Sequence, residues 1–301
     1  MQSFSYRAKA EMCRAAVQRS CCARAESYGV LLYANTFTMQ EVRIITENPE
    51  FAQRLPRLFH RAFGVKFDRV PTDEVPGGKL IFQIGDREKL HRIVDTLGYD
   101  ARQALVLHVN YALLEEECCR AAFLRGAFLA GGSVTDPMKR YHLELSTSHV
   151  QASREVSALL QEMNFLPRSV MRGGSAVIYF KQSEHIEDML TTLGAPAAAT
   201  EIMSAKVDKE IRNDVNRATN CDMANVNKTL EAAAAQCGAI DALEKSGKLQ
   251  QMPEKIQETA RLRIENPELP LTELSALFDP PISKSCLNHR IRKLMEEAKK
   301  L

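Results

Sequence analysis

The segment CCARAESYGVLLYANTF, residues 21–37, is followed later in the chain by the related segment CCRAAFLRGAFLAGGSV, residues 118–134. The two segments align without a gap at an offset of 97 residues, with cysteines on cysteines and Gly29 on Gly126. Similarity at a fixed offset is the signature of an internal repeat, and a repeat determines how the chain divides into units. If a unit is duplicated, further matches should occur at nearly the same offset.

Two further matches do occur, and in the same order. A glycine pair at residues 77–78 precedes the apolar run KLIFQI, just as the pair at 173–174 precedes SAVIYF, at an offset of 96. The Leu-Gly pair at 97–98 corresponds to the Leu-Gly pair at 193–194, again at an offset of 96. Three ordered matches predict a duplicated unit of about 95 residues.

Both copies predict the same order of elements. A helix of small residues comes first, followed by two segments with strand composition. A helix with apolar residues at helical spacing comes next, and a further strand pair and a helix end the unit. These elements are TFTMQEVRIIT (36–46) and the helices 50–63 and 86–97 in the first copy, and GSVTD (132–136), KRYHLELST (139–147) and the helices 149–163 and 182–193 in the second. The unit is predicted to be α+β.

The leading helices carry small residues where large ones would normally face a core. In the second copy these are Gly126, Ala127, Ala130 and Gly131. Small side chains let two helix backbones approach closely, so the two copies of this helix are predicted to pack on each other about a pseudo-twofold axis. The alternative is that each copy is an ordinary buried helix, which the repeat argues against.

Residues 123–133, FLRGAFLAGGS, resemble the LAGLIDADG motif of homing endonucleases. The resemblance implies a duplicated α/β saddle, in which two such helices form the interface between two halves and each half adds a curved sheet that lies on DNA. In that family an acidic residue near the end of each helix binds a divalent metal ion. The aligned positions here are Ala34 in the first copy and Gly131 in the second.

The loss of these acids argues against nuclease chemistry. Metal-assisted cleavage of a phosphodiester needs anionic oxygen ligands to hold Mg²⁺, and neither Ala34 nor Gly131 can supply one. Asp136, the nearest acid downstream, belongs to a predicted Asp-Pro turn and is a poor replacement. We therefore expect no catalytic residue, no metal and no cofactor. A residual metal-dependent nuclease is the least favoured alternative.

The whole chain resembles the WhiA family of bacterial regulators. The resemblance runs through four segments, MQSFSYRAKAEMCR, RGAFLAGGSVTDPMKRYHLELST, RNDVNRATNCDMANVNKT and PPISKSCLNHRIRKL, while SYGVLLYAN in the first copy fits more loosely. It implies a degenerate homing-endonuclease-like domain joined to a helix-turn-helix, in a regulator of cell-division or sporulation genes. An adaptor that binds a division or transcription protein through its saddle is the alternative.

The C-terminal residues predict three helices. The first, PEKIQETARLRIEN, begins at Pro253 and ends before Pro267. The second, LTELSALF, has Thr272 as its predicted N-cap and is broken by the segment 279–281, Asp-Pro-Pro. Ser283 is predicted to cap the third helix. Its residues Leu287, Ile291 and Leu294 recur at helical spacing and predict a core stripe.

This arrangement is typical of a helix-turn-helix, whose last helix presents its early residues to the major groove of DNA. Asn288 and Arg292 are the predicted base-reading residues, because Asn pairs with adenine and Arg with guanine. Arg290 and Lys293 suit phosphate contacts. The full set of predicted DNA-binding residues is Lys284, Ser285, Asn288, His289, Arg290, Arg292 and Lys293. The alternative is a three-helix bundle with a solvated basic face.

Composition restricts the class of protein. The net charge is only +2, but positive charge gathers at both ends, over residues 1–24 and 284–301. The eight cysteines include two adjacent pairs and no CxxC spacing, so we expect reduced structural thiols and no zinc. No apolar run is long enough to span a bilayer, and the N-terminus does not read as a secretory signal.

Three domains are therefore expected. They are a first LAGLIDADG-like repeat with a basic N-terminal helix (1–113), a second repeat (114–214), and a helical linker with a helix-turn-helix (215–301). Within the linker, five asparagines between 213 and 227 either line an interface or are solvated, and the solvated reading is favoured. The expected partner is double-stranded DNA in the cytoplasm, at the nucleoid, with another transcription factor or an RNA polymerase component as a further candidate and no membrane.

Overall fold

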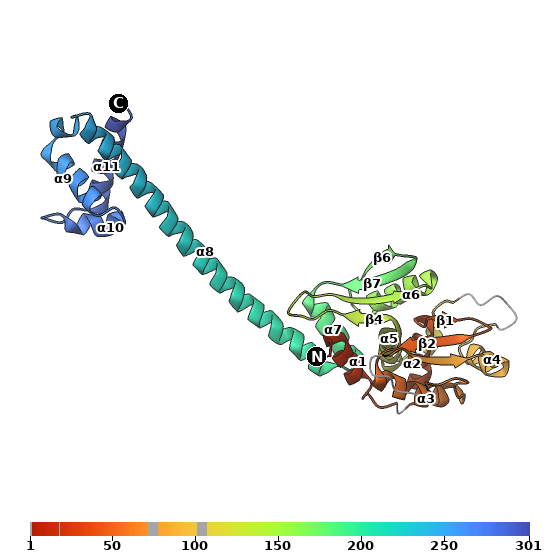
Figure 1. The fold of residues 1–301 in the computed structure, drawn as a ribbon. Coiled ribbons are helices and arrows are strands. Elements are labelled where there is room, and N and C mark those ends of the chain that lie inside the picture. Colours follow the sequence, from red (N-terminus) through yellow and green to blue (C-terminus); the bar gives the residue numbers. More distant parts are fainter. Residues whose placement is uncertain (1, 18, 72–77, 101–106) are drawn as a thin grey trace. The chain divides into compact units, whose positions relative to one another are not determined.

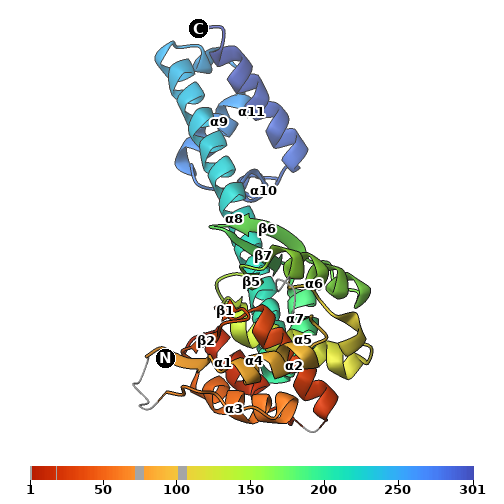
Figure 2. The same ribbon diagram turned by 90° about the vertical axis from the view of Figure 1, so that its right-hand side faces the viewer.

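The computed structural model describes residues 2–17, 19–71, 78–100 and 107–301. The chain forms two compact units, Met1–Lys209 and Glu210–Leu301 (Figures 1 and 2). The first unit contains both helices and strands, whereas the second contains only helices. None of the described helices combines the length and the apolar composition that a membrane span requires.

The first copy of the repeat follows a short N-terminal helix. That helix, α1, spans Phe4–Met12, and Ser3 caps it by accepting a hydrogen bond of 3.1 Å from the Tyr6 amide. The elements of the copy are α2 (Ser20–Leu32), β1 (Thr36–Phe37), β2 (Val42–Thr46), α3 (Pro49–Phe63), β3 (Leu80–Ile84) and α4 (Arg87–Thr96). Its antiparallel sheet has the order β1-β2-β3.

The second copy repeats this order after a 3-10 turn, η1 (Tyr111–Leu113). Its elements are α5 (Glu117–Gly131), β4 (Gly132–Val134), β5 (Leu143–Thr147), α6 (Val150–Glu162), β6 (Arg168–Arg172), β7 (Ser175–Phe180) and α7 (Ser183–Leu193). The antiparallel sheet has the order β4-β5-β7-β6, so the predicted final strand pair is present here.

In the first copy, only part of the predicted final strand pair falls on described residues. The strand that matches β6 is represented, among the described residues, by a single bridge between Arg69 and Gln83 of β3. Pro71 follows two residues later and cannot donate a hydrogen bond to a strand ladder. The rest of the predicted pair falls on residues 72–77, which lie outside the described residues.

The two leading helices pack on each other, as the small residues predict. A Cβ placed on Gly29 of α2 would overlap the carbonyl oxygen of Phe123 and lie 2.8 Å from the amide nitrogen of Ala127 on α5. A Cβ placed on Gly126 of α5 would overlap the carbonyl oxygen of Glu26 and lie 3.0 Å from the amide nitrogen of Val30 on α2. These contacts are equivalent at the repeat offset of 97, so the helix pair has pseudo-twofold symmetry.

A buried ion-pair network reinforces this interface. Arg54 of α3 binds Glu26 of α2 through two hydrogen bonds, of 2.5 and 2.8 Å, and Arg125 of α5 approaches the same carboxylate at 3.3 Å. Glu26 is almost fully buried. Because a buried carboxylate is tolerated only when it is paired, Glu26 connects three helices of the first unit.

One long helix, α8 (Pro196–Lys245), follows the second copy. Its first turns bury Ala198, Ala199 and Ile202 in the first unit, and its last turns bury Ile240 and Leu243 in the second. Every residue from 210 to 228 is exposed, including the five asparagines, in line with the solvated reading. The predicted boundary between residues 214 and 215 lies inside this helix.

The second unit continues with η2 (Leu249–Gln251), α9 (Glu254–Glu265), α10 (Leu271–Leu274), η3 (Ser275–Leu277) and α11 (Lys284–Ala298). The prediction of Thr272 as an N-cap is wrong. Pro270 takes the N-cap position, and α10 has no side-chain cap. The backbone carbonyl of Thr272 instead accepts a hydrogen bond of 2.8 Å from the Ser275 hydroxyl.

Candidate nucleic-acid interface

Helix α11 begins where the sequence predicts. Ser283 has an extended backbone, and its hydroxyl oxygen accepts a hydrogen bond of 3.2 Å from the amide of Cys286. This contact satisfies one of the amides that a helix leaves without a partner in its first turn. The cap therefore fixes the residue at which the helix starts, and with it the direction of every later side chain.

One stripe of α11 is buried in two clusters of the second unit. Leu287 and Ile291 pack with Leu274 and Phe278, from α10 and the turn after it. Leu294 packs instead in the cluster that contains the end of α8 and the start of α9. Because both ends of the stripe are held, the opposite face of α11 is presented on a rigid support.

The opposite and flanking faces carry most of the predicted DNA-binding residues. Six of the seven are exposed: Lys284, Ser285, Asn288, His289, Arg292 and Lys293. Among the described residues, none of these six side chains makes an ion pair or a side-chain hydrogen bond within the protein. At about 100° per residue, Ser285, His289 and Arg292 point away from the buried stripe, and Asn288 lies on its flank. The structure thus gathers these six on one helix.

Arg290 is the exception and corrects the sequence prediction. Its guanidinium donates to the carbonyl oxygen of Lys255 at 3.3 Å and lies 3.9 Å from the carboxylate of Glu258. It also lies over the ring of Phe278, 5.4 Å from the centroid, with 14% of its side chain exposed. Arg290 therefore connects α11 to α9 and to the preceding turn, and we do not include it among the phosphate-binding residues.

Arg263 of α9 is a further positioning residue, which the sequence reading missed. Its side chain is buried and donates a hydrogen bond of 2.6 Å to the carbonyl oxygen of Leu269, in the loop before α10. Burial lowers the pKa of its guanidinium. Its spacing in the sequence could have revealed this role. Arg263 follows Ile256 at i+7 and Ala260 at i+3, so it belongs to the buried stripe of α9.

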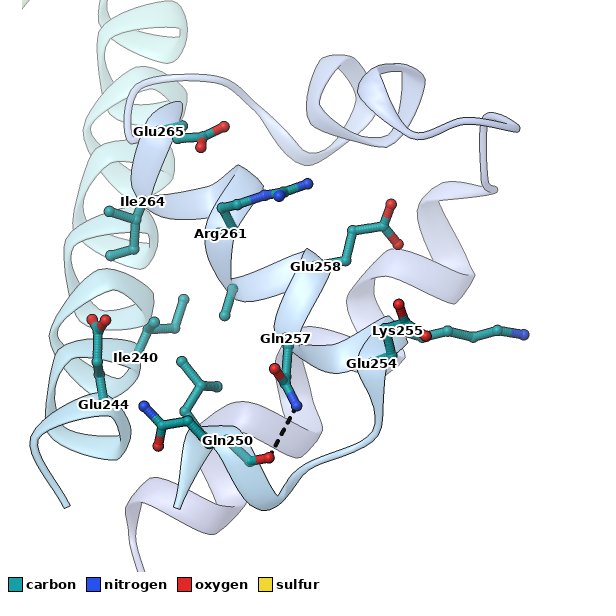
Figure 3. A pocket seen from close by; sticks show the side chains of 12 residues that line it. Ile240, Glu244, Gln250, Glu254, Lys255, Gln257, Glu258, Arg261, Ile264 and Glu265 are labelled. Carbon is teal, nitrogen blue, oxygen red and sulfur yellow. Dashed lines mark hydrogen bonds between the residues drawn. The ribbon is translucent and has the colours of Figure 1, made fainter. Parts of the chain in front are cut away.

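A separate pocket of about 730 Å³ lies between the end of α8 and α9 (Figure 3). Four glutamates line it: Glu244, Glu254, Glu258 and Glu265. Gln257 closes part of its wall through a hydrogen bond of 3.2 Å to the carbonyl oxygen of Gln250. None of the α11 residues lines this pocket, and its acidic lining would repel phosphate, so it is not part of the candidate interface.

In the first unit, the two positions that align with nuclease metal ligands have no side-chain atom that could bind a metal ion. Ala34 is buried and has no ligand atom in its side chain. At Gly131 even a Cβ would overlap the carbonyl oxygen of Ser146 and come within 2.9 Å of the Tyr33 ring. An aspartate therefore could not be restored at residue 131 without a shift of the backbone.

A lysine lies at the same end of α5. The Lys9 ammonium donates a hydrogen bond of 3.1 Å to the carbonyl oxygen of Leu129 and lies 5.7 Å from the centroid of the Phe128 ring. Burial lowers the pKa of Lys9 to about 8. Arg7 is paired with Glu201 at 2.5 Å, whereas Arg14 and Arg19 are exposed. The basic N-terminal segment thus has part of its charge committed within the protein.

Comparison with known proteins identifies relatives of both units. The family model described as "WhiA C-terminal HTH domain" matches residues 215–298, and that described as "WhiA LAGLIDADG-like domain" matches residues 120–212. A protein of Ruminiclostridium cellulolyticum, named "Probable cell division protein WhiA", is 34% identical over 99% of this chain and 98% of its own length. A protein of Alkaliphilus oremlandii with the same name is 35% identical over the same shares.

Two crystal structures also resemble this fold. Full-length WhiA from Thermotoga maritima covers 100% of this chain and 99% of that chain, with a TM-score of 0.60 at 20% identity. The N-terminal LAGLIDADG domain of WhiA covers 64% of this chain and 94% of that chain, with a TM-score of 0.50 at 16% identity. At such identities these matches concern the fold alone.

Proposed function

This chain belongs to the WhiA family, and on that premise we propose that it is a sequence-specific DNA-binding regulator of transcription. Its recognition helix is α11, and its targets include cell-division or sporulation genes. The name of its relatives, probable cell division proteins, supports the choice of target. The protein acts in the cytoplasm, at the nucleoid.

The exposed face of α11 is the observation that carries this proposal. Lys284 and Ser285 lie in its first turn, Asn288 and His289 in the next, and Arg292 one turn further. Early residues of a recognition helix reach base edges in the major groove. Asn288 and Arg292 read adenine and guanine through paired hydrogen bonds, while Lys284 and Lys293 neutralise phosphates.

The saddle of the first unit has a supporting and positioning role, and it does not cut DNA. Neither Ala34 nor Gly131 has an oxygen ligand for Mg²⁺, and the Lys9 ammonium lies at the end of α5 close to residue 131. Plasmid incubated with the protein and Mg²⁺ or Mn²⁺ should therefore stay intact. Cleavage that is lost on substitution near residue 131 would contradict this part of the proposal.

Substitution of Arg292 tests the proposed recognition helix. Selection from a random DNA pool first gives the preferred site of the full-length protein. Arg292→Ala should then lose roughly 1 to 3 kcal/mol of affinity at that site, about 5- to 150-fold, and accept other bases at one position. Arg261→Ala is the matched control, because Arg261 is an exposed arginine of α9 that lines the acidic pocket. Unchanged affinity in Arg292→Ala would remove Arg292 from the interface.

The adaptor alternative predicts a different result in cells. Asn288→Ala combined with Arg292→Ala should abolish promoter occupancy of the full-length protein if α11 directs it to DNA. Retained occupancy would mean that a partner, such as another transcription factor or an RNA polymerase component, recruits the protein through its saddle.

A further inference from the structure

Two pairs of adjacent cysteines meet at one end of the central helix pair. Cys21 and Cys22 lie in the first turn of α2, and Cys118 and Cys119 lie in the first turn of α5. The Sγ atoms of Cys21 and Cys119 lie within 4.8 Å of each other, and Cys118 is an electrostatic neighbour of Cys22. The repeat offset of 97 exchanges the pair Cys21 and Cys119 with the pair Cys118 and Cys22, so the four cysteines are grouped around the pseudo-twofold axis.

This end of the helix pair is distinct from the degenerate nuclease end. Gly29 and Gly126 touch in the C-terminal halves of the helices, and Gly131 lies beside Tyr33 at their C-terminal ends. The cysteines occupy the N-terminal ends. A function at the cysteines is therefore independent of the loss of the acids at residues 34 and 131.

The distances between the sulfur atoms suit a metal ion. The Sγ atoms of Cys21, Cys22 and Cys119 all lie within 4.8 Å of one another. In a tetrahedral zinc site with Zn–S bonds of about 2.3 Å, neighbouring sulfur atoms are about 3.8 Å apart. Small side-chain rotations would bring these three thiols to that separation. Thiolate sulfur is also the ligand that zinc prefers at structural sites in proteins.

The electrostatic surroundings differ among the three thiols. Burial raises the pKa of Cys22 to about 11 and also raises that of Cys119. Burial acts in the same direction on Cys21, but hydrogen bonds with Cys119 and Cys22 outweigh it and lower its pKa. Cys119 is buried and Cys21 and Cys22 are half-buried, so the cluster lies partly inside the protein.

The cluster is accessible from outside. Cys21 and Cys119 line a pocket of about 180 Å³, whose rim carries Glu115, Glu116 and Arg24. A hydrated ion could enter by this route, and the two carboxylates attract cations to it. Cys118, which lies beside Cys22 with its sulfur atom 3.8 Å from the Arg19 guanidinium, is the nearest thiol for a fourth ligand.

We propose that Cys21, Cys22 and Cys119 bind one zinc ion that joins the two repeats of the saddle at the N-terminal ends of α2 and α5. The fourth position is filled by Cys118 or by an oxygen ligand from the pocket. Binding replaces S–H protons by Zn–S bonds, so the protons of the three thiols are released to solvent and no oxidant is needed. This inference revises the sequence expectation of no zinc.

The proposal is tested by zinc titration of the full-length protein. The protein is freed of metal with a chelator under a thiol-free reductant and titrated with Zn²⁺ against a chromophoric chelator. One zinc ion per chain is expected, with an affinity that rises with pH because protons are released. Cys21→Ser, Cys22→Ser and Cys119→Ser should each weaken binding by at least about 100-fold, more than the loss of a residue that only supports a ligand.

Cys286→Ser is the matched control, because Cys286 is an exposed cysteine of α11 in the other unit. It should bind zinc like the wild type. Absence of stoichiometric binding, or equal affinity in the three cluster variants, would overturn the proposal. A Cys21–Cys119 disulfide in metal-free protein isolated from reducing cytoplasm would also overturn it, because the pair would then be a redox couple.

Cobalt provides a measurement that does not depend on the variants folding. Co²⁺ added to the metal-free wild-type protein should give the strong visible absorption of a tetrahedral site and a sulfur-to-metal charge-transfer band. The intensity of that band distinguishes four thiolates from three thiolates and an oxygen, and either result supports the site. The weak spectrum of octahedral Co²⁺ would contradict it.

Discussion

Two glycines explain why the halves of the saddle can meet. The reciprocal contacts of Gly29 and Gly126 leave no space for a Cβ atom at either position, because each would overlap a backbone carbonyl oxygen of the other helix. Backbone atoms cannot move aside as a flexible side chain can. The interface is therefore specified by the absence of side-chain atoms at two symmetric positions.

Gly126→Ala should destabilise the first unit by about 3 kcal/mol or more, at the upper end of the range for overpacking. Gly238→Ala is the matched control in a helix. At Gly238 in α8 a Cβ would meet no atom within 4 Å, so alanine should stabilise by up to about 1 kcal/mol through helix propensity. Urea unfolding of both variants measures the two effects, and equal effects would show that the close approach does not limit packing.

Lys9 predicts a pH dependence of stability. Burial lowers its pKa to about 8 in the folded protein, against about 10.4 in the unfolded chain. Between these values the unfolded state binds more protons, so the contribution of Lys9 to the free energy of unfolding rises with pH, by no more than about 3 kcal/mol in total.

Removal of this amine should make the free energy of unfolding rise less steeply with pH. The free energy of unfolding of the wild type minus that of Lys9→Met should increase from pH 8 to pH 10. Lys66→Met, at an exposed position of the same unit, should show the same pH dependence of the free energy of unfolding as the wild type. Parallel curves for the wild type and Lys9→Met would show that the amine stays solvated in the folded state.

At the scale of elements, α8 is exceptional because its middle has no tertiary support. All residues from 210 to 228 are exposed, and only the ends of the helix are buried in the two units. A helix without packing depends on local propensity alone, so its opening costs little free energy. The predicted division of the chain near residue 215 falls in this stretch.

Limited proteolysis should therefore cut α8 first. Trypsin should cleave after Arg212, Arg217 or Lys228 and leave two resistant fragments, while Arg120 and Arg125 in the packed helix α5 stay uncut. Mass spectrometry of the early fragments identifies the sites. If the first cuts fall inside α5 or α9 instead, the exposed middle of α8 is protected, and the proposed boundary near residue 215 is wrong.

At the scale of the whole molecule, the net charge of +2 says little about DNA binding. What matters is which cations remain available on the surface. Lys293 is exposed on α11 in the second unit, whereas Arg7 in the first unit is paired with Glu201 at 2.5 Å. Binding through a local cluster of cations releases the counterions of the contacted phosphates and makes affinity depend steeply on salt.

The logarithm of the affinity for DNA should therefore fall linearly with the logarithm of the salt concentration. Lys293→Ala should reduce the slope by about 1 at every DNA sequence, with little change in sequence preference. Arg7→Ala should leave the slope unchanged. If Arg7→Ala lowers the slope and Lys293→Ala does not, the main phosphate contacts are on the saddle.

The sequence by itself determined the local features of this protein. Periodicity located the helices and most strands, the offset of 97 revealed the repeat, and Ser283 was a correct cap because a cap depends on the next three residues only. Helical spacing predicted the buried stripe of α11. That stripe in turn predicted which faces of the helix carry the exposed DNA-binding candidates. Ala34 and Gly131 could be recognised as unable to bind metal from residue type alone.

Only the tertiary structure decided contacts between residues far apart in the chain. Arg290 was expected to contact a phosphate because its charge is visible in the sequence. Its contacts with Glu258 and Phe278 could not be predicted from the sequence. The cysteines were judged by their spacing along the chain, whereas packing of α2 on α5 joins pairs that lie 97 residues apart. Side-chain chemistry is written in the sequence, but the distances that turn it into an ion pair or a metal site arise only when helices pack.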